Sequence, residues 1–316
     1  MRIGYFLSSE EFGPADLLDQ ARRAQDAGFE ALWISDHFHP WLDAQGESPF
    51  VWSTIGALSQ VCRLPVMTAV TCPTTRIHPA IIAHAAATSA VMLEGRFVLG
   101  VGTGEALNEH IYGDPWPGAD VRLEMLEEAV EVMRTLWAGG FVDYRGEYYT
   151  LDNARLYTLP DEPPKVFVSG FGPKSIDLAA EIGDGYISTK PDAGMIQRFR
   201  EKGGGDKPAT AGLKVCFAAT EDEGVRIAHE TWPNEGLPGE LAQVLPSPKH
   251  FEQASKLVTP EMTAQSHACG PDPEKHLETI RKYVDAGYDE IYVNNIGPHW
   301  PEFFQLYAKE ILPALR

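Results

Sequence analysis

Apolar residues along the chain alternate between a helical spacing and short continuous runs. The stretch after Pro14, a residue suited to the first turn of a helix, places four apolar residues on one helical stripe: Leu17, Leu18, Ala21 and Ala24. Continuous apolar runs are typical of strands that are buried on both faces, as in parallel sheets. Eight such runs predict strands near residues 2–7, 31–35, 66–71, 97–101, 165–169, 185–189, 212–218 and 290–295.

A glycine-containing joint connects helix to strand at three places. Residues 26–35 and 285–294 both contain Asp-Ala-Gly followed by an aromatic residue, an acidic residue and an apolar run, and residues 181–188 hold a shorter copy around Gly183. In each copy the glycine can adopt the left-handed conformation that ends a helix. Repeats of this kind predict parallel strands covered by helices. Eight parallel strands in 316 residues predict an α/β fold of one domain, a (β/α)8 or TIM barrel over residues 1–316.

Two stretches interrupt the repeat. After the predicted fourth barrel helix, at residues 121–138, the segment 141–149 predicts a β-hairpin excursion. The segment 221–271, after the seventh strand, is rich in proline and too long for a simple crossover. We expect it to be a helical insertion and a candidate lid.

Charge and composition narrow the class of protein. The chain carries 26 Lys and Arg against 45 Asp and Glu, a net charge of −19, which disfavours nucleic-acid and polybasic membrane contacts. The chain begins with an apparent strand rather than a signal peptide, and no apolar run is long enough to span a membrane. The four cysteines do not have the spacing of a zinc site or a disulfide framework. We therefore expect a cytoplasmic protein with no nucleic-acid or membrane partner.

The densest group of polar residues follows the second predicted strand, at Ser35-Asp36-His37-Phe38-His39. Barrel enzymes place their chemistry at the C-terminal ends of the strands, where a histidine can act as a base and a neighbouring carboxylate can orient it. A simple capping role is the alternative. The spacing of His37 and His39 also suits a metal, but no other strand end offers His or Asp to complete a ligand set, so we expect no metal.

Three further strand ends suggest a binding site for a flat ligand. The fourth strand continues into Gly102-Thr103-Gly104-Glu105, where backbone can approach a ring and Glu105 can face the mouth; a tight turn is the alternative. Its glycine spacing is not that of a dinucleotide-binding loop. The fifth strand leads through residues 169–175 into a helix start, a candidate phosphate site or an ordinary helix start. The third strand, with residues 67–74, offers a wall of small residues.

Several segments together resemble one family. They are residues 35–41, 100–109, 146–149 and 183–185, and their order and spacing hold along most of the chain, most weakly between about 190 and 271. This set resembles the coenzyme F420-dependent glucose-6-phosphate dehydrogenases of the luciferase-like flavin and deazaflavin barrel superfamily.

The resemblance implies an enzyme that transfers a hydride between an alcohol or lactol carbon and F420, a deazaflavin. It implies that His37 is the base, that Glu105 protonates the reduced ring and that Trp41 stabilises the intermediate. It also implies that Asp36 contacts the cofactor and the histidine. A non-proline cis peptide is implied between Ala69 and Val70, against the ring. The remaining implied cofactor contacts are Thr103, Gly104, Asn108, Gly170 and Gly172.

The predicted substrate pocket departs from the family. Its members hold a sugar phosphate with two lysines and an arginine, but residues 263–268 contain no cation. Candidate substrate contacts are Glu10, Lys190, Arg198 and Arg200. An uncharged sugar or secondary alcohol fits equally well, as does reduction of a carbonyl or an activated alkene by reduced F420. Two other readings are an FMN-dependent monooxygenase on the same barrel and a non-catalytic flavin-binding protein. The family also implies a homodimer.

Overall fold

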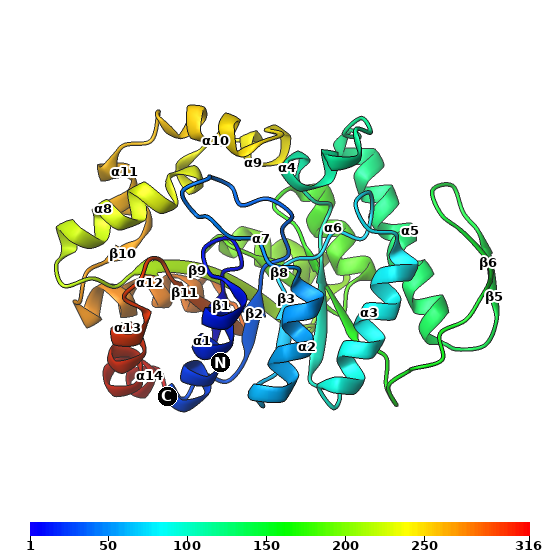
Figure 1. Cartoon of the computed structure of the whole chain (residues 1–316), viewed down its shortest axis with the longest axis horizontal. Helices are drawn as coiled ribbons and strands as arrows, with labels where there is room; N and C mark the ends of the chain where they lie inside the picture. Colours follow the sequence, from blue (N-terminus) through cyan, green and yellow to red (C-terminus); the bar gives the residue numbers. More distant parts are fainter.

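Parallel strands form a closed barrel, as predicted (Figure 1). The computed structural model describes residues 1–316. Neighbouring strands pair in chain order, β11 pairs with both β1 and β9, and the β8–β9 pairing completes the ring. The barrel strands are β1 (Arg2–Leu7), β2 (Leu32–Ile34), β3 (Val66–Thr68), β4 (Phe97–Val101), β7 (Lys165–Ser169), β8 (Gly185–Ser188), β9 (Ala209–Cys216) and β11 (Glu290–Asn295).

Helices surround this barrel on the outside (Figure 1). In the first of them Leu17, Ala21 and Ala24 are buried as the stripe predicts, while Leu18 is half-buried. The outer helices are α1 (Pro14–Ala27), α2 (Val51–Val61), α3 (Pro79–Met92), α5 (Ala119–Trp137), α6 (Pro173–Ile182), α7 (Ala193–Phe199), α12 (Pro273–Ala286), α13 (Trp300–Leu306) and α14 (Leu312–Leu315).

The glycine joints differ from one another in conformation. Gly28 and Gly287 have φ angles of 97° and 96°, the left-handed helix ends that were predicted. Gly183 has a φ angle of −81°, so the prediction of a left-handed cap was wrong there. A Cβ atom on Gly183 would lie 2.6 Å from the carbonyl oxygen of Ala179. Glycine at this position therefore serves close packing rather than a left-handed turn.

Some element boundaries differ from those predicted. β3 ends at Thr68 rather than at residue 71, because the chain turns through a cis peptide bond between Ala69 and Val70 before Thr71 bridges to Val101. The hairpin is present as β5 (Val142–Arg145) and β6 (Thr150–Ala154), and it projects from the body of the molecule (Figure 1). It extends beyond the predicted segment.

The segment 221–271 contains several helices that lie together above the barrel, beside α4 (Ala106–Glu109) (Figure 1). It ends in the short strand β10 (Ala268–Cys269), which pairs with β9. Its helices are α8 (Glu221–Thr231), α9 (Leu241–Val244), α10 (Pro248–Ser255) and α11 (Pro260–Ser266). A lid function for this segment stays a prediction.

Large side chains fill the inside of the barrel below its mouth. Trp33 and Tyr292 stack with their ring centroids 4.4 Å apart, and Phe6 meets Trp33 edge to face. Gly212 leaves room for the Trp33 ring, since a Cβ there would lie 2.5 Å from it. A larger apolar layer lies between the strands and the outer helices. Both layers hold the C-terminal ends of the strands in fixed positions.

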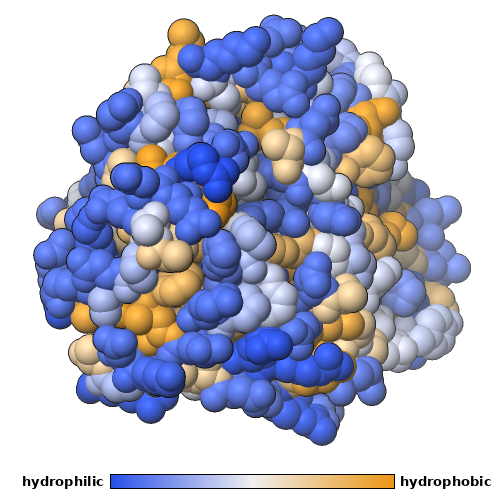
Figure 2. All heavy atoms as spheres, turned by 60° about the vertical axis from the view of Figure 1, so that its left-hand side comes forward, coloured by the Kyte–Doolittle hydropathy of each residue, from blue (hydrophilic) through white to orange (hydrophobic).

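The outer surface is mainly polar. Figure 2 shows a face that is largely hydrophilic, with hydrophobic residues in small separate groups. None of the helices combines the length and the apolar character that crossing a bilayer requires. The four cysteines are buried and unpaired.

Candidate active site

A polar layer lies above the aromatic core. Alternate residues of a strand face the same side, so the residues two positions after the core residues also face the barrel interior. Ser35 comes two residues after Trp33, Lys214 two after Gly212, and Asn294 two after Tyr292. These side chains lie at the C-terminal ends of β2, β9 and β11. The candidate site is built on this layer and on the loops that follow the strands.

His37 has a hydrogen-bond acceptor beside each ring nitrogen and a donor beside one of them. Its Nε2 is 3.3 Å from the buried carboxylate of Glu10, and its Nδ1 is 3.2 Å from the carbonyl oxygen of His39. The Asn108 amide nitrogen lies 3.0 Å from the same Nδ1. Acceptors near both ring nitrogens stabilise the protonated ring, and the Asn108 donor stabilises the neutral one. The site can therefore hold His37 in both states that a base requires.

Glu10 is held from within the protein and does not face outward as a substrate contact. The hydroxyls of Ser8 and Ser35 donate to one of its oxygens at 2.9 and 2.7 Å, and His37 lies at the other. Burial acts to raise the pKa of Glu10, but His37, Ser35 and Lys214 outweigh it and lower the pKa. Glu10 is thus an ionised partner for His37.

Asn108 connects His37 to Glu105. Its carbonyl oxygen accepts from the backbone N–H groups of Phe38 and His39 at 2.9 and 3.0 Å, which fixes the orientation of the amide. Its nitrogen then faces both the His37 ring and Glu105, the latter at 3.5 Å. The structure therefore brings the two predicted catalytic residues to one side chain.

Asp36 belongs to a buried ionic network rather than contacting the His37 ring. It accepts from Thr71 at 2.8 Å and from Arg76 at 3.0 Å, and Arg76 also contacts Glu109 at 3.4 Å. All three charged side chains are buried. Burial raises the pKa of Glu109 to about 7, against the lowering effect of Arg76. Sequence reasoning missed Arg76 and Glu109 because no local pattern links the segments that carry them.

The glycines after β4 approach the protein's own chain. A Cβ on Gly102 would lie 2.8 Å from Val70, and one on Gly104 would lie 2.6 Å from Cys72. Gly104 also has a φ angle of 75°. These glycines let the loop pack against the cis peptide segment at Ala69–Val70. Close packing within the protein thus explains why glycines occur at these positions. Thr103, between them, is half-buried and its hydroxyl has no partner in the chain.

The start of α6 offers less to a phosphate than its sequence suggested. Gly170 is buried, its N–H donates to Ile187 and its carbonyl accepts from Tyr186. The N–H of Gly172 donates to the Ser175 hydroxyl at 3.1 Å. Space beside Gly172 is open, since the nearest atom to a Cβ there is 3.9 Å away. An anion can approach at Gly172, whereas Gly170 has a packing role.

Aromatic rings flank the histidine. The ring of Trp41 lies 5.0 Å from that of His37 and 5.1 Å from that of Phe251 on α10. Trp41 also packs against the cluster that contains Trp232, at the end of α8. The segment 221–271 thus forms part of the wall around His37.

Two of the predicted cationic contacts lie away from this cluster. Arg198 pairs with Asp177 between α7 and α6, and its guanidinium also donates to Pro173. Arg200 pairs with Asp289, which precedes β11, so it lies at the opposite end of the barrel. Local carboxylates on the helix side engage both arginines, and a substrate contact for either stays a prediction. Lys190 is exposed, 6.0 Å from the ring of Phe171.

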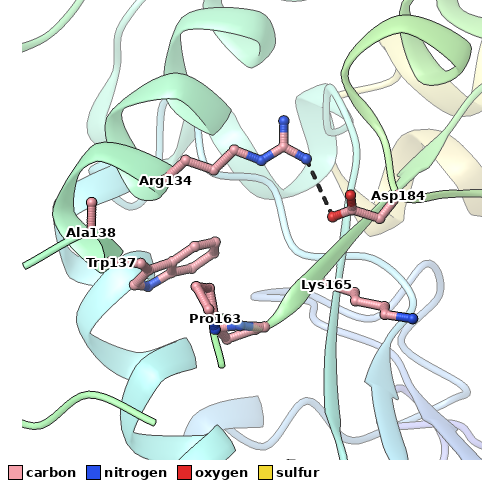
Figure 3. Close-up of a pocket in the computed structure, with 7 residues that line it drawn as sticks. Arg134, Trp137, Ala138, Pro163, Lys165 and Asp184 are labelled. Atoms are coloured by element: carbon pink, nitrogen blue, oxygen red, sulfur yellow. Dashed lines mark hydrogen bonds and ion pairs between the residues drawn. The ribbon is translucent and has the colours of Figure 1, made fainter. Parts of the chain in front are cut away.

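A depression of about 350 Å³ lies away from the site, near the N-terminal ends of β7 and β8 (Figure 3). Trp137, Pro163 and Lys165 line it beside the ion pair of Arg134 with Asp184, whose atoms are 3.2 Å apart. The same Asp184 accepts from the backbone of Val166 at 2.8 Å. These contacts join α5 to the barrel floor and have no link to the His37 cluster. No three His, Cys, Asp or Glu side chains gather to hold a metal ion.

Comparison with known proteins shows the family to which the chain belongs. The model of the luciferase-like monooxygenase family matches residues 1–290. The chain belongs to the luciferase-like family. Within this family, a relative from Microbacterium testaceum (strain StLB037), an F420-dependent glucose-6-phosphate dehydrogenase, is 34% identical over 331 residues, covering 100% of this chain and 98% of the relative. This confirms the resemblance seen in the sequence.

Solved structures of the luciferase-like family agree with the fold. An F420-dependent secondary alcohol dehydrogenase in complex with an F420–acetone adduct is 33% identical, with a TM-score of 0.92, and the match covers 100% of this chain and 99% of that one. The F420-dependent tetrahydromethanopterin reductase from Methanopyrus kandleri has a TM-score of 0.80 at 18% identity and covers both chains fully. The second likeness shows the fold alone.

Proposed function

We propose that this protein is an F420-dependent oxidoreductase that takes a hydride from the alcohol carbon of a small substrate. The observation that carries the proposal is the Asn108 amide, which contacts His37 at 3.0 Å and Glu105 at 3.5 Å. This amide holds the proposed base, His37, and the proposed acid, Glu105, together at the mouth of the barrel. Support also comes from the M. testaceum relative and the secondary alcohol dehydrogenase, both F420-dependent.

The groups at the mouth suit a planar ring with polar edges. The Thr103 hydroxyl and one oxygen of Glu105 are half-buried and have no partner in the chain, so both are available to a ligand. Val70, in the cis peptide segment, provides an apolar surface beside them. When bound, F420 supplies a ring that accepts two electrons as hydride.

His37 is proposed to take the hydroxyl proton. As the alcohol C–H bond breaks, its electron pair leaves with the hydrogen as hydride, the O–H proton passes to the unprotonated nitrogen of the His37 ring, and the carbonyl double bond forms. Glu10 at 3.3 Å and the Trp41 ring at 5.0 Å both favour the positive charge that results. Glu105 is proposed to supply the proton that balances the charge of the reduced ring.

The FMN-dependent monooxygenase remains the alternative on this barrel, since the family model carries that description. It would require an external reductant and oxygen. The resemblance of the segments around His37 and Glu105 to the F420 branch, at 34% identity over the full chain, favours F420.

A fluorescence-quenching titration with oxidised F420, and separately with FMN, tests the proposal. We expect tight binding of F420, weak binding of FMN, and loss of F420 absorbance when 2-propanol is added. A preference for FMN would move the protein to the monooxygenase alternative and remove the roles given to His37 and Glu105.

We also propose that the protein associates with a second copy through α3. The helix contains no Asp, Glu, Lys or Arg, although outer barrel helices normally carry a charged outer face. Ile81 on it is 60% exposed, and Val91 and Met92 are also exposed. Burying this face against another copy would remove that apolar surface from water.

A further inference from the structure

Four cationic side chains lie around the candidate site. Lys190 follows β8 and is exposed, and Arg122, near Glu105, donates to the Pro117 carbonyl and the Gln243 side chain. Arg76 is enclosed by Asp36 and Glu109. Lys214 comes from β9, and the alternation that directs Gly212 at the Trp33 ring directs Lys214 at the mouth, one layer higher. Its ammonium lies 5.4 Å from the ring of Phe6, which belongs to the barrel interior. Lys214 is therefore the cation that a substrate beside His37 would meet.

Lys214 is already paired with a residue of the segment above the barrel. Its ammonium donates to Glu235, and it lies 4.1 Å from the ring centroid of Trp232. Only 11% of its side chain is exposed. The carboxylate and the indole together leave the ammonium little contact with solvent.

Glu235 is itself fixed from a second side. His267, which is buried, lies with its Nε2 2.9 Å from the other Glu235 oxygen. The His267 Nδ1 is 3.3 Å from the carbonyl oxygen of Thr263. Burial acts to raise the pKa of Glu235, but Lys214 and His267 lower it to about 2. Glu235 is therefore ionised at physiological pH and cancels the charge of Lys214.

The remaining walls near His37 are apolar. Trp41 contacts both the Trp232 cluster and Phe251, and Phe6 lies beneath Lys214. A phosphate dianion beside His37 would find the Lys214 ammonium already paired with Glu235. Leaving such a group unpaired is costly.

We propose that Glu235 determines the substrate class: by binding Lys214 it neutralises the cation beside His37, so that the site accepts an uncharged secondary alcohol, or its ketone, and rejects sugar phosphates. This inference rests on the F420-dependent function proposed above. It makes Glu235 a specificity residue contributed by the segment between β9 and β10, and not by the barrel.

The test compares Glu235→Gln with the double variant Glu235→Gln/Lys214→Met. The Gln side chain keeps nearly the same shape but frees Lys214. We expect calorimetric titration of glucose 6-phosphate to show little binding to the wild type. Glu235→Gln should bind it at least roughly tenfold more tightly, the gain expected from one charge-assisted hydrogen bond. The double variant should lose the gain. Equal binding by wild type and Glu235→Gln would overturn the proposal.

A second measurement uses the unaltered enzyme, in case Glu235→Gln fails to fold. The substrates 2-butanol and 3-hydroxybutanoate have the same four-carbon skeleton and a secondary hydroxyl, and only the second is charged. We expect kcat/KM with F420 to favour 2-butanol by about 100-fold or more, given the cost of an unpaired carboxylate. Equal use of both, or efficient oxidation of glucose 6-phosphate, would overturn the proposal.

Failure of the underlying function is distinguishable from failure of this inference. A wild-type protein that neither binds F420 nor reduces it with any alcohol would contradict the proposed function. The calorimetric comparison of glucose 6-phosphate binding needs no turnover, so it still decides whether Glu235 screens Lys214.

Discussion

Arg76 shows how one buried cation is shared by two carboxylates. Asp36 and Glu109 approach it at 3.0 and 3.4 Å, and all three side chains are shielded from water. A single positive charge cannot fully compensate two negative ones at low dielectric. Burial raises the pKa of Glu109 to about 7, and Arg76 offsets only part of this rise.

Glu109 makes the stability of the protein depend on pH. Its pKa rises from the usual 4.5 to about 7 on folding, so between these values the folded protein holds a proton that the unfolded chain has lost. The free energy of unfolding should therefore fall as pH rises through this range, by about 3 kcal/mol from this group, and stay level above it. Glu109→Gln removes the effect. Urea unfolding at pH 4.5 and pH 7.5 should show that the free energy of unfolding of the variant increases relative to that of the wild type as pH rises. A difference between the two proteins that does not change with pH would contradict this.

Substitution at His37 and Glu105 tests the proposed acid and base. His37→Ala and Glu105→Gln should each lower kcat for 2-propanol oxidation by about 100-fold or more, the usual loss for a general acid or base. His110→Gln is a matched control, because His110 is a nearby histidine whose Nδ1 bonds to the Ala106 carbonyl and not to the cluster. Wild-type rates in both variants would exclude the assigned roles, provided thermal unfolding shows that each protein is folded.

At the scale of elements, the site depends on contacts between the barrel and the segment 221–271. Glu11, in the loop after β1, accepts from the Trp232 indole at 2.8 Å and from the backbone of Gly297. Burial raises the pKa of Glu11 to about 7, with Trp232 and Gly297 acting against the rise. This carboxylate joins the end of α8 to the loops after β1 and β11.

Trp232→Phe removes the hydrogen bond of that connection and keeps an aromatic ring. We expect a loss of about 1–3 kcal/mol in local stability, the range for hydrogen bonds to charged groups. Hydrogen exchange should become faster in residues 233–266. Trp52→Phe is the matched control, because the Trp52 indole nitrogen is buried without a partner. Unchanged exchange in Trp232→Phe would show that the indole bond does not hold the segment.

At the scale of the molecule, the closed barrel determines which end carries chemistry. All barrel strands are parallel, so their C-terminal ends meet in one ring where His37, Glu105 and Lys214 converge. The opposite end holds structural ion pairs such as Arg200 with Asp289. The helices that end at Gly28 and Gly287 return the chain to this opposite end of the barrel.

The proposed association through α3 predicts a dimer in solution. Size-exclusion chromatography with light scattering should give twice the chain mass of 34.8 kDa. Ile81→Glu should shift the mass to that of one chain, because a buried unpaired carboxylate opposes association. Leu257→Glu is the control, since this exposed residue lies in the segment 221–271 above the barrel. A monomeric wild type would contradict the proposal.

The sequence by itself determined the architecture and the centre of the site. Parallel buried strands leave continuous apolar runs, and helix ends leave glycines, so local patterns predicted the barrel, and the resemblance of residues 35–41 and 100–109 identified His37 and Glu105. These signals are short-range, because backbone conformation and strand burial act over a few residues. Strand ends such as that of β3 were less well predicted, since the apolar run continues past Thr68, where the strand ends.

Only the tertiary structure decided which charges are free. Arg198 and Arg200 look available in the sequence, but Asp177 and Asp289 engage them on the helix side. Lys214 looks like an ordinary strand residue until folding brings Glu235 onto it from an irregular segment. Long-range pairing depends on how that segment packs over the barrel, and no periodicity records it. The proposed pairing of Lys214 with Glu235 would therefore set the substrate class at the level of tertiary structure.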